Sequence, residues 1–542
     1  MPSLEARTGA LGVRLAKHLL RRTTYHITRS KIDQFAALEA ADAVDLLMVT
    51  TAPSVPEPID PATGQPWINS GVPSDSSSDR QRDYVKAWWM NEARLDEGIA
   101  HKMMFFLHSH FTVDFNVKDS EQDFDYLALL RYYALGNFKV LARKMVADNL
   151  MLKYLNGDQN GKWGVNENFA REFFELYTIG KGPQQGPGDY TNYTETDIQA
   201  AAQLLTGWKK GEDRTDPNNI DPDTGIPRGW ARVEKHDELD KQFTAAFNNT
   251  TITGRNTAVG MWEELEEFVD MIFAQDETAR HICRKLYRHF VNRNITSDIE
   301  TDIIEPLAAT FRENDYSLEI VMSELLASEH FYDDDNASMG SHTIGTMIKS
   351  PLENLLTTMN FFTVVVPDPV TETEQHYYEF WRRSVRKIIL DYSGMPLFVP
   401  TVVAGYSAYY QAPDYHRNWF NSSTIITRYK LPQMLLENSR VLAYGELGVQ
   451  LNIVDWVADP ANISNPNDPF VIVSEMLTYL LPEYPEATRE SYYMDLFLDG
   501  LDPTDWYFEW QNYLTTGDDS EVIIPLKHLA TAIMHSQEYQ LF

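Results

Sequence analysis

Twelve residues, Asn156 to Glu167, have the composition and spacing of a helix-flanked calcium loop. Oxygen-bearing side chains stand at loop positions one, three and five (Asn156, Asp158, Asn160), Gly161 occupies the turn position six, and Glu167 occupies position twelve. Because a hard cation takes six to eight oxygen ligands, the loop predicts a site for calcium or another divalent cation. Only two of these side chains carry a charge, so we expect weak binding. The alternative is a connection between helices in which the same side chains cap backbone groups.

The helix predicted to follow this loop, from Asn166 to Ile179, has an apolar stripe and a polar face. Its polar residues are predicted to line a binding pocket: Asn166, Asn168, Arg171, Glu172 and Glu175. We expect the polar helix start to be largely withdrawn from solvent, with Arg171 paired to Glu167 or Glu175. The alternative is a solvated ladder of ion pairs on a surface helix.

Four ionisable residues are candidates for catalysis: His110, Glu172, His236 and Asp237. If they converge on a metal ion, they suit a metal-assisted hydrolase, with Glu167 or Glu175 in a supporting role. The alternative interpretation is structural. A histidine beside Phe111 is often a hydrogen-bonded interior residue, and a His-Asp pair in a loop often stabilises a turn.

A fourth cluster, Tyr415, His416, Arg417 and Trp419, combines aromatic and basic residues. Arg417 and Trp419 are candidates for the floor of a sugar- or peptide-binding cleft. Packing at the edge of a domain explains the cluster equally well.

The composition excludes several classes of protein. The 46 Lys and Arg against 79 Asp and Glu give a net charge of −33, which repels phosphate backbones and argues against nucleic acid as a partner. The single cysteine, Cys283, excludes a disulfide framework, a thiolate zinc cage and an iron–sulfur cluster. The chain also lacks a G-x-S-x-G elbow, a nucleotide-binding P-loop and an H-E-x-x-H zinc motif, and we expect neither nucleotide nor haem.

The elements that must position these residues are predicted to be helices. Apolar residues recur at helical spacing along most of the 542 residues, which predicts a mainly α, large multi-helix, orthogonal or bundle-like architecture with helix above half of the chain. Residues 183–192 and 211–229 are predicted to be long polar loops. The D-P-x-T-G segments at Asp60 and Asp221 are predicted tight turns, with cation-binding loops as the alternative. Only Val364–Val366 and Val522–Ile524 look like strands.

We expect an N-terminal helical region, residues 1–350, and a C-terminal helical region, residues 351–542, packed as one unit. No run of about 18 apolar residues is present, so no membrane span is expected. No signal peptide is visible either. The expected location is therefore cytoplasmic by default, with the cell envelope or secretion as the alternative.

Several motifs resemble the bacterial domain of unknown function 1800 family. The central ones are NENFAREFFELYTIGKG from Asn166, YTETDIQAAAQLLTGW from Tyr193 and HDELDK from His236. FLHSHFTV from Phe106, KLYRHFV from Lys285 and GMPLFVPTVVAGY from Gly394 fit as well, so the resemblance covers nearly the whole chain. It implies a large, mostly helical bacterial protein with no settled activity. Family association further implies an exported sulfatase-like partner.

Two functions from different classes therefore remain. One is the metal-assisted hydrolase that uses His110, Glu172, His236 and Asp237. The other is a non-catalytic envelope or matrix scaffold, stabilised by calcium, that binds a partner through its Pro-rich loops.

Overall fold

The computed structural model of the protein describes residues 1–49, 56–70, 74–116, 119–338, 341–437 and 451–542. Helices make up 57% of it, and its strands form short antiparallel pairs, which confirms the predicted mainly α fold. Within these ranges no helix is long and apolar enough to cross a bilayer.

Before the loop from Asn156 to Glu167 the chain forms α1 (Gly12–Thr23), α2 (Arg29–Ala36), α3 (Ala40–Met48), α4 (Ser78–Leu95), α5 (Ala100–His110), α6 (Ser120–Tyr132), α7 (Phe138–Met145) and α8 (Asn149–Tyr154). The middle of the chain forms α9 (Asn168–Glu172), α10 (Glu195–Leu204), α11 (Ala258–Phe273), α12 (Asp276–Phe290), α13 (Ser297–Ile299), α14 (Glu305–Glu313), α15 (Leu318–Ala327) and α16 (Pro351–Phe361).

The C-terminal part forms α17 (Glu374–Tyr378), α18 (Ser407–Tyr410), α19 (Thr424–Arg428), α20 (Lys430–Leu436), α21 (Ile453–Ala458), α22 (Pro469–Leu480), α23 (Ala487–Leu498), α24 (Pro503–Thr516) and α25 (Ser520–His535). Among the described residues, three segments are wound as π-helices: η2 (Phe173–Tyr177), η6 (Glu300–Ile304) and η9 (Glu379–Leu390).

The described strands pair as four antiparallel hairpins: β1 (Ile59–Asp60) with β2 (Gln65–Pro66), β3 (Gln184–Gly186) with β4 (Asp189–Tyr190), β5 (Trp208–Lys209) with β6 (Trp230–Ala231), and β7 (Lys241–Gln242) with β8 (Thr251–Ile252). Both D-P-x-T-G segments are turns, as predicted. The carboxylates of Asp60 and Asp221 accept hydrogen bonds from the backbone N–H groups of Ala62 and Asp223, two residues further on.

Both strand predictions are wrong. Val522–Ile524 lies in α25, where Val522, Leu526, Leu529 and Ile533 are buried at helical spacing while Ile524 faces solvent. The helical period of the longer segment therefore outweighs the β-branched run. Val364–Val366 forms no strand, and Val365 is exposed.

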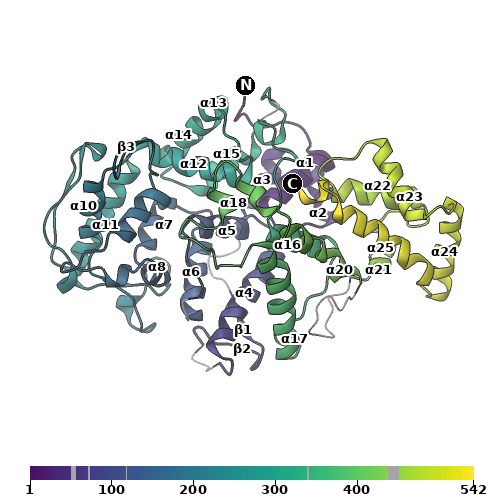
Figure 1. Cartoon of the computed structure of the whole chain (residues 1–542), viewed down its shortest axis with the longest axis horizontal. Helices are drawn as coiled ribbons and strands as arrows, with labels where there is room; N and C mark the ends of the chain where they lie inside the picture. The colour runs from purple at the N-terminus through teal and green to yellow at the C-terminus, as the bar shows by residue number, and fades with distance from the viewer. Residues whose placement is uncertain (50–55, 71–73, 117–118, 339–340, 438–450) are drawn as a thin grey trace.

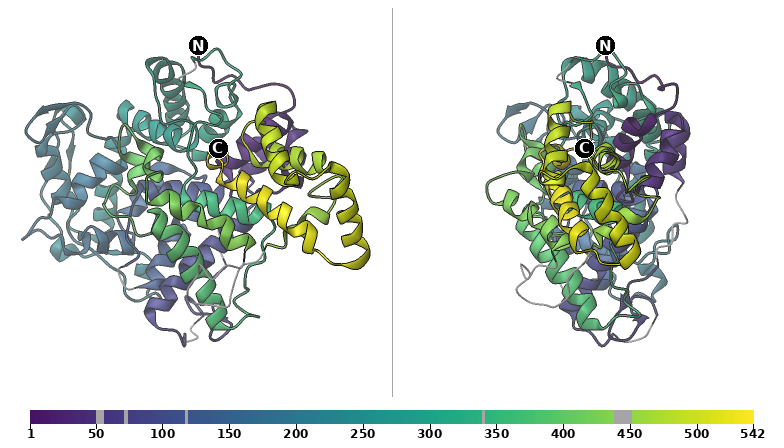
Figure 2. Two further views of the ribbon diagram at one scale, coloured as in Figure 1. Left: turned by 45° about the vertical axis from the view of Figure 1, so that its right-hand side comes forward. Right: turned by 90° about the vertical axis from the view of Figure 1, so that its right-hand side faces the viewer.

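Helices α7, α8, α10 and α11 lie at one end of the long axis and α22 to α25 at the other, with α5 and α16 between them (Figure 1). The residues of α5 are almost all buried, so this helix runs through the core. The expected boundary near residue 350 is crossed by many contacts. The Lys102 ammonium of α5 lies 2.6 Å from the Glu353 carboxylate of α16, for example, and Arg29 of α2 pairs with Glu475 of α22 at 2.7 Å. Figure 2 shows α1 to α3 beside the C-terminal helices in both views.

Candidate functional site

The predicted calcium loop connects α8 to α9 through a short 3₁₀ turn, η1 (Gly157–Gln159). The buried Asn160 amide donates to the Ala202 carbonyl at 2.9 Å, and its oxygen accepts from the Asn166 N–H at 2.9 Å. Glu167 contacts the Arg171 guanidinium at 3.3 Å. Two of the four predicted ligands, Asn160 and Glu167, are therefore engaged elsewhere in this structure, and calcium binding stays a prediction.

The polar start of α9 is more exposed than expected. Asn166, Glu167, Arg171 and Glu172 are partly buried, whereas Asn168 is exposed, so the prediction that this set is largely withdrawn from solvent holds in part for four residues and is wrong for Asn168. These residues belong to a short helix at the surface, whose apolar stripe alone faces the core.

Arg171 forms its shortest ion pair with Glu195, at 2.7 Å, in addition to its contact with Glu167. Glu175, the other expected partner, lies in η2 and pairs with Lys181 instead. Burial and the neighbouring Glu175 carboxylate raise the pKa of Glu172 to about 7.

His236 belongs to a buried polar cluster, which Asp237 joins only through its backbone, because its partly exposed carboxylate accepts from the Leu239 N–H. The His236 Nε2 lies 3.2 Å from the Glu264 carboxylate and its Nδ1 lies 2.9 Å from the Thr206 carbonyl. The ammonium of Lys241, fully buried, lies 2.9 Å from the other Glu264 oxygen and also donates to the Asp237 carbonyl. Burial opposes ionisation of Glu264, but the hydrogen bonds from His236 and Lys241 lower its pKa below the ordinary value.

His110 lies in a different environment. Its Nε2 donates to the Tyr177 carbonyl at 2.9 Å, and its Nδ1 lies 3.3 Å from the Lys285 ammonium. Within the described ranges, the side chains of His110, Glu172 and His236 make no hydrogen bond to one another, nor do three His, Cys, Asp or Glu side chains gather as a set of metal ligands. The structure therefore does not bring the predicted catalytic set together.

Trp419 is buried and packs on Tyr406 and Tyr409, with ring centroids 6.1 and 5.8 Å away, so it cannot form the floor of an open cleft. Arg417 is exposed beside it. The burial of Trp419 therefore fits the second interpretation of this cluster, packing at the edge of a domain.

The motif residues form a hydrogen-bonded network instead. The fully buried Asp197 carboxylate accepts from the Thr194 N–H and hydroxyl at the start of α10, at 2.8 and 2.9 Å. It also accepts from the Thr244 N–H and hydroxyl, at 2.7 and 2.8 Å, so it ties α10 to the end of β7. This Asp197 combines a helix cap with a tertiary contact.

Gly207, at the other end of the α10 motif, joins the calcium-like loop to the segment after β6. Its N–H donates to the Asn160 carbonyl, and its carbonyl accepts from the Arg232 N–H. Gly207 has φ +87°, and a Cβ there would lie 3.0 Å from atoms of Arg232 and His236, so no other residue fits without strain. The network therefore fixes the base of the hairpin formed by β5 and β6.

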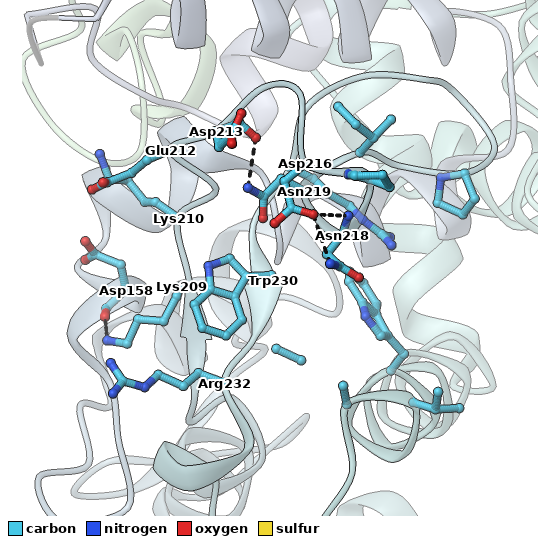
Figure 3. Close-up of a pocket in the computed structure, with 18 residues that line it drawn as sticks. Asp158, Lys209, Lys210, Glu212, Asp213, Asp216, Asn218, Asn219, Trp230 and Arg232 are labelled. Carbon is cyan, nitrogen blue, oxygen red and sulfur yellow. Dashed lines mark hydrogen bonds between the residues drawn. The ribbon is translucent and has the colours of Figure 1, made fainter.

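That hairpin borders a pocket of about 930 Å³, shown in Figure 3. We call it the Trp230 pocket. It lies between η1, the polar loop after β5, strand β6 and the start of α11. Trp230 stands in the middle of the view with its side chain 38% exposed, while the Arg228 guanidinium lies 4.1 Å from the ring centre of Trp262.

The polar lining of the Trp230 pocket is balanced in charge. Its ionisable residues are Asp158, Glu212, Asp213 and Asp216 on the acidic side and Lys209, Lys210, Arg228 and Arg232 on the basic side. Lys209 donates to the Asp158 backbone carbonyl. In the described part of the chain the Asp158 carboxylate itself has no hydrogen-bond partner, and one of its oxygens is buried. Such a group is available to a ligand or a bound water.

Of these lining residues, only Asp158 is among the site residues predicted from the sequence. Trp230 and Lys209 could have been found, because an indole beside basic residues at the ends of a long polar loop is an unusual surface feature. Glu264 could also have been found, because it falls among Met261, Leu265 and Phe268 on the apolar face of α11, where a carboxylate needs a partner.

Comparison with known proteins identifies a family. A family model described as "Protein of unknown function (DUF1800)" matches residues 18–541. No curated protein and no solved structure matches the chain. With nearly its full length covered by that model, the chain belongs to the DUF1800 family of proteins of unknown function.

Proposed function

We propose that this protein is a binding protein that takes a saccharide in the Trp230 pocket. The observation that carries the proposal is the partly exposed Trp230 indole, set among carboxylates, amides and cationic side chains in a pocket of about 930 Å³. A pocket of this size suits a ligand of several sugar units.

The chemistry of the lining favours a neutral polyhydroxylated ligand. An indole offers a flat apolar surface to the C–H face of a sugar ring. A hydroxyl both donates and accepts, so it pairs equally well with carboxylates such as Asp158 and with ammonium groups such as Lys210. Because acidic and basic residues are equal in number, the lining has no strong preference for an ion of either sign.

The metal-assisted hydrolase receives less support. His110, Glu172 and His236 have separate hydrogen-bond partners, and both ring nitrogens of His110 and of His236 are already engaged. A catalytic metal needs three protein ligands that converge, with an open position for water. Hydrolysis by this set would therefore require rearrangement of two buried histidines.

Two further elements of the binding-protein hypothesis come from the sequence. Calcium in the loop from Asn156 to Glu167 would stabilise the wall of the pocket, because Asp158 belongs to both. An exported sulfatase-like protein is the proposed partner, with the cell envelope as the place where they meet. Co-purification of that protein with the tagged chain tests the partnership.

Glycan binding tests the proposed function directly. Purified protein is applied to an array of neutral and acidic oligosaccharides, and the affinity of each retained glycan is then measured by calorimetry. Loss of an aromatic stacking surface removes about 1.5–3 kcal/mol, so Trp230→Ala should weaken binding roughly ten- to a hundredfold.

Trp163→Ala is the matched control, because Trp163 is 72% exposed but does not line the pocket. It should leave the affinity within about twofold of the wild type. Absence of any retained glycan, or equal binding by Trp230→Ala and the wild type, would refute the proposal. Release of new reducing ends from a retained glycan would favour the hydrolase instead.

A further inference from the structure

A second, smaller cavity lies in the middle of the molecule, apart from the Trp230 pocket. We call it the Lys285 cavity. It has a volume of about 30 Å³, opens partly to solvent and is lined by residues of α5, α12, α18 and the 3₁₀ turn η11 (Tyr415–Trp419). Its polar lining residues are Ser109 and His110 from α5, Lys285, Arg288 and His289 from α12, and the two tyrosines Tyr409 and Tyr415.

The lining contains two cationic side chains and no carboxylate. The carboxylates nearby are already paired: Glu353 lies 2.6 Å from Lys102, and Glu300 lies 2.6 Å from Arg284. Arg288 forms no ion pair within the described ranges, its Nε is buried without a partner, and its guanidinium lies 5.3 Å from the ring centre of Tyr415. In a protein of net charge −33, a partly buried cavity with this excess of positive charge is unexpected.

The two histidines add neutral hydrogen-bonding groups to the cavity. A carbonyl oxygen only accepts, so His110 must carry its proton on Nε2, which faces the Tyr177 carbonyl. Its Nδ1 then accepts from the Lys285 ammonium at 3.3 Å, and the same ammonium donates to the Leu176 carbonyl at 2.7 Å. His289 stacks on Tyr409 with ring centroids 4.8 Å apart, and among the described residues neither of its ring nitrogens has a hydrogen-bond partner.

Burial disfavours the charges in this cavity. Burial, and then the charge of Arg288, lower the pKa of Lys285 to about 7. Burial also lowers the pKa of His289 to about 3, so that ring is neutral. Two adjacent cations without a counter-charge are an energetically unfavourable arrangement, and a bound anion would remove the penalty.

We infer that the Lys285 cavity binds a tetrahedral oxyanion, phosphate or sulfate, held by the Arg288 guanidinium and the Lys285 ammonium. The guanidinium fork matches two oxygens of such an anion, and the ammonium supplies a further charged donor. His289 and Tyr415 line the same cavity and offer an N–H and an O–H group for the remaining oxygens. A cavity of about 30 Å³ has room for about two or three water molecules, and one tetrahedral anion takes up a similar space.

The oxyanion is either a free ion or the end group of a larger ester. Both present the same charged group to the cavity, and they differ only in size.

Two motifs of the sequence, FLHSHFTV and KLYRHFV, supply the α5 and α12 residues of the cavity, and the Trp230 pocket uses neither. The site is therefore independent of the proposed saccharide pocket.

Calorimetric titration of the full-length protein with sodium phosphate, sodium sulfate and methyl phosphate tests the inference, with sodium chloride at equal ionic strength as the reference. The wild type should bind at least one oxyanion saturably, and chloride should not reproduce the signal. Arg288→Gln and Lys285→Met should each weaken that binding at least tenfold, because each removes a charged donor. Stronger binding of methyl phosphate than of phosphate would identify an ester end group, and the reverse would identify a free ion.

Arg280→Gln is the matched control on the same helix, since Arg280 does not line the cavity and contacts Glu277 at 3.9 Å. It should bind within about twofold of the wild type. Circular dichroism of each variant establishes its folding, and either cavity variant suffices if the other does not fold. No saturable binding by the wild type, or equal affinity in a folded cavity variant, would overturn the inference.

Discussion

The strongest test of the polar network is the substitution Glu264→Gln. In the wild type the buried Glu264 carboxylate accepts from His236 at 3.2 Å, from the Lys241 ammonium at 2.9 Å and from the Arg255 N–H. A glutamine keeps the shape but leaves the Lys241 charge, 0% exposed, without its counter-charge. Breaking a buried ion pair on one side typically destabilises a protein by about 3–5 kcal/mol.

That loss converts into a measurable change in melting temperature. With an unfolding entropy of about 2.1 cal/mol/K per residue, a chain of this length that unfolds as one unit should melt roughly 3–4 °C lower. Scanning calorimetry at pH 7 measures the shift. The double variant Glu264→Leu with Lys241→Met should lose less than the single variant, because it leaves no unpaired charge behind.

Glu263→Gln is the control, since Glu263 is the adjacent residue on α11 but its side chain is 55% exposed, at 3.2 Å from Arg255. An exposed ion pair of this kind contributes about 0–1 kcal/mol, so its melting temperature should change by less than about 1 °C. A change for Glu264→Gln within that same range would refute the role of the buried ion pair.

The stabilisation by Glu264 should also depend on pH. Because the folded-state pKa of Glu264 is lowered, its contribution to stability is present above the unfolded pKa of about 4.3 and is lost as the pH falls through the folded value. The difference in melting temperature between the wild type and Glu264→Gln should therefore become smaller in acid.

Two further predictions concern Glu172 of α9 and the loop from Asn156 to Glu167 before it. The pKa of Glu172 is raised to about 7, so its contribution to stability is present below the unfolded pKa of about 4.3 and is lost as the pH rises through 7. Glu172→Gln should therefore reduce the fall in melting temperature between pH 5 and pH 8, and an unchanged fall would contradict this. For the calcium hypothesis, calcium added to chelator-stripped protein should raise the melting temperature, and Glu167→Gln should abolish the rise. Identical wild-type melting curves with and without calcium would exclude the site.

Local features of this fold were predictable, because short-range sequence patterns determine them. The Phe169 and Phe173 stripe is buried as its spacing predicts, and the turns at Asp60 and Asp221 follow from Asp, Pro and Gly. The strand prediction at Val522 failed because β-branched residues also fit one face of a long helix when their neighbours keep its period.

The sites were less predictable because they depend on contacts between distant segments. His236 is visible in the sequence, but its partner Glu264 lies 28 residues later. Arg288 and Ser109 meet across the Lys285 cavity from helices that are far apart in the chain. The four predicted catalytic residues were of suitable type, yet type and loop context do not determine which of them share a cavity.

The network also changes what the recognisable motifs mean. Asp197, Gly207 and His236 are buried and hydrogen-bonded. Asp197 joins α10 to the segment after β7, Gly207 contacts Asn160 and Arg232, and His236 joins the end of α10 to α11, so these residues hold secondary-structure elements together. The ligand-facing residues lie directly beside them: Lys209 and Trp230 are paired across β5 and β6, immediately after the Thr-Gly-Trp motif and before the His236 segment. A loop whose two ends are fixed in this way can change its sequence without disturbing the core. We therefore expect differences in ligand between related chains to arise in residues 210–229, while substitutions in the motifs themselves act first on stability.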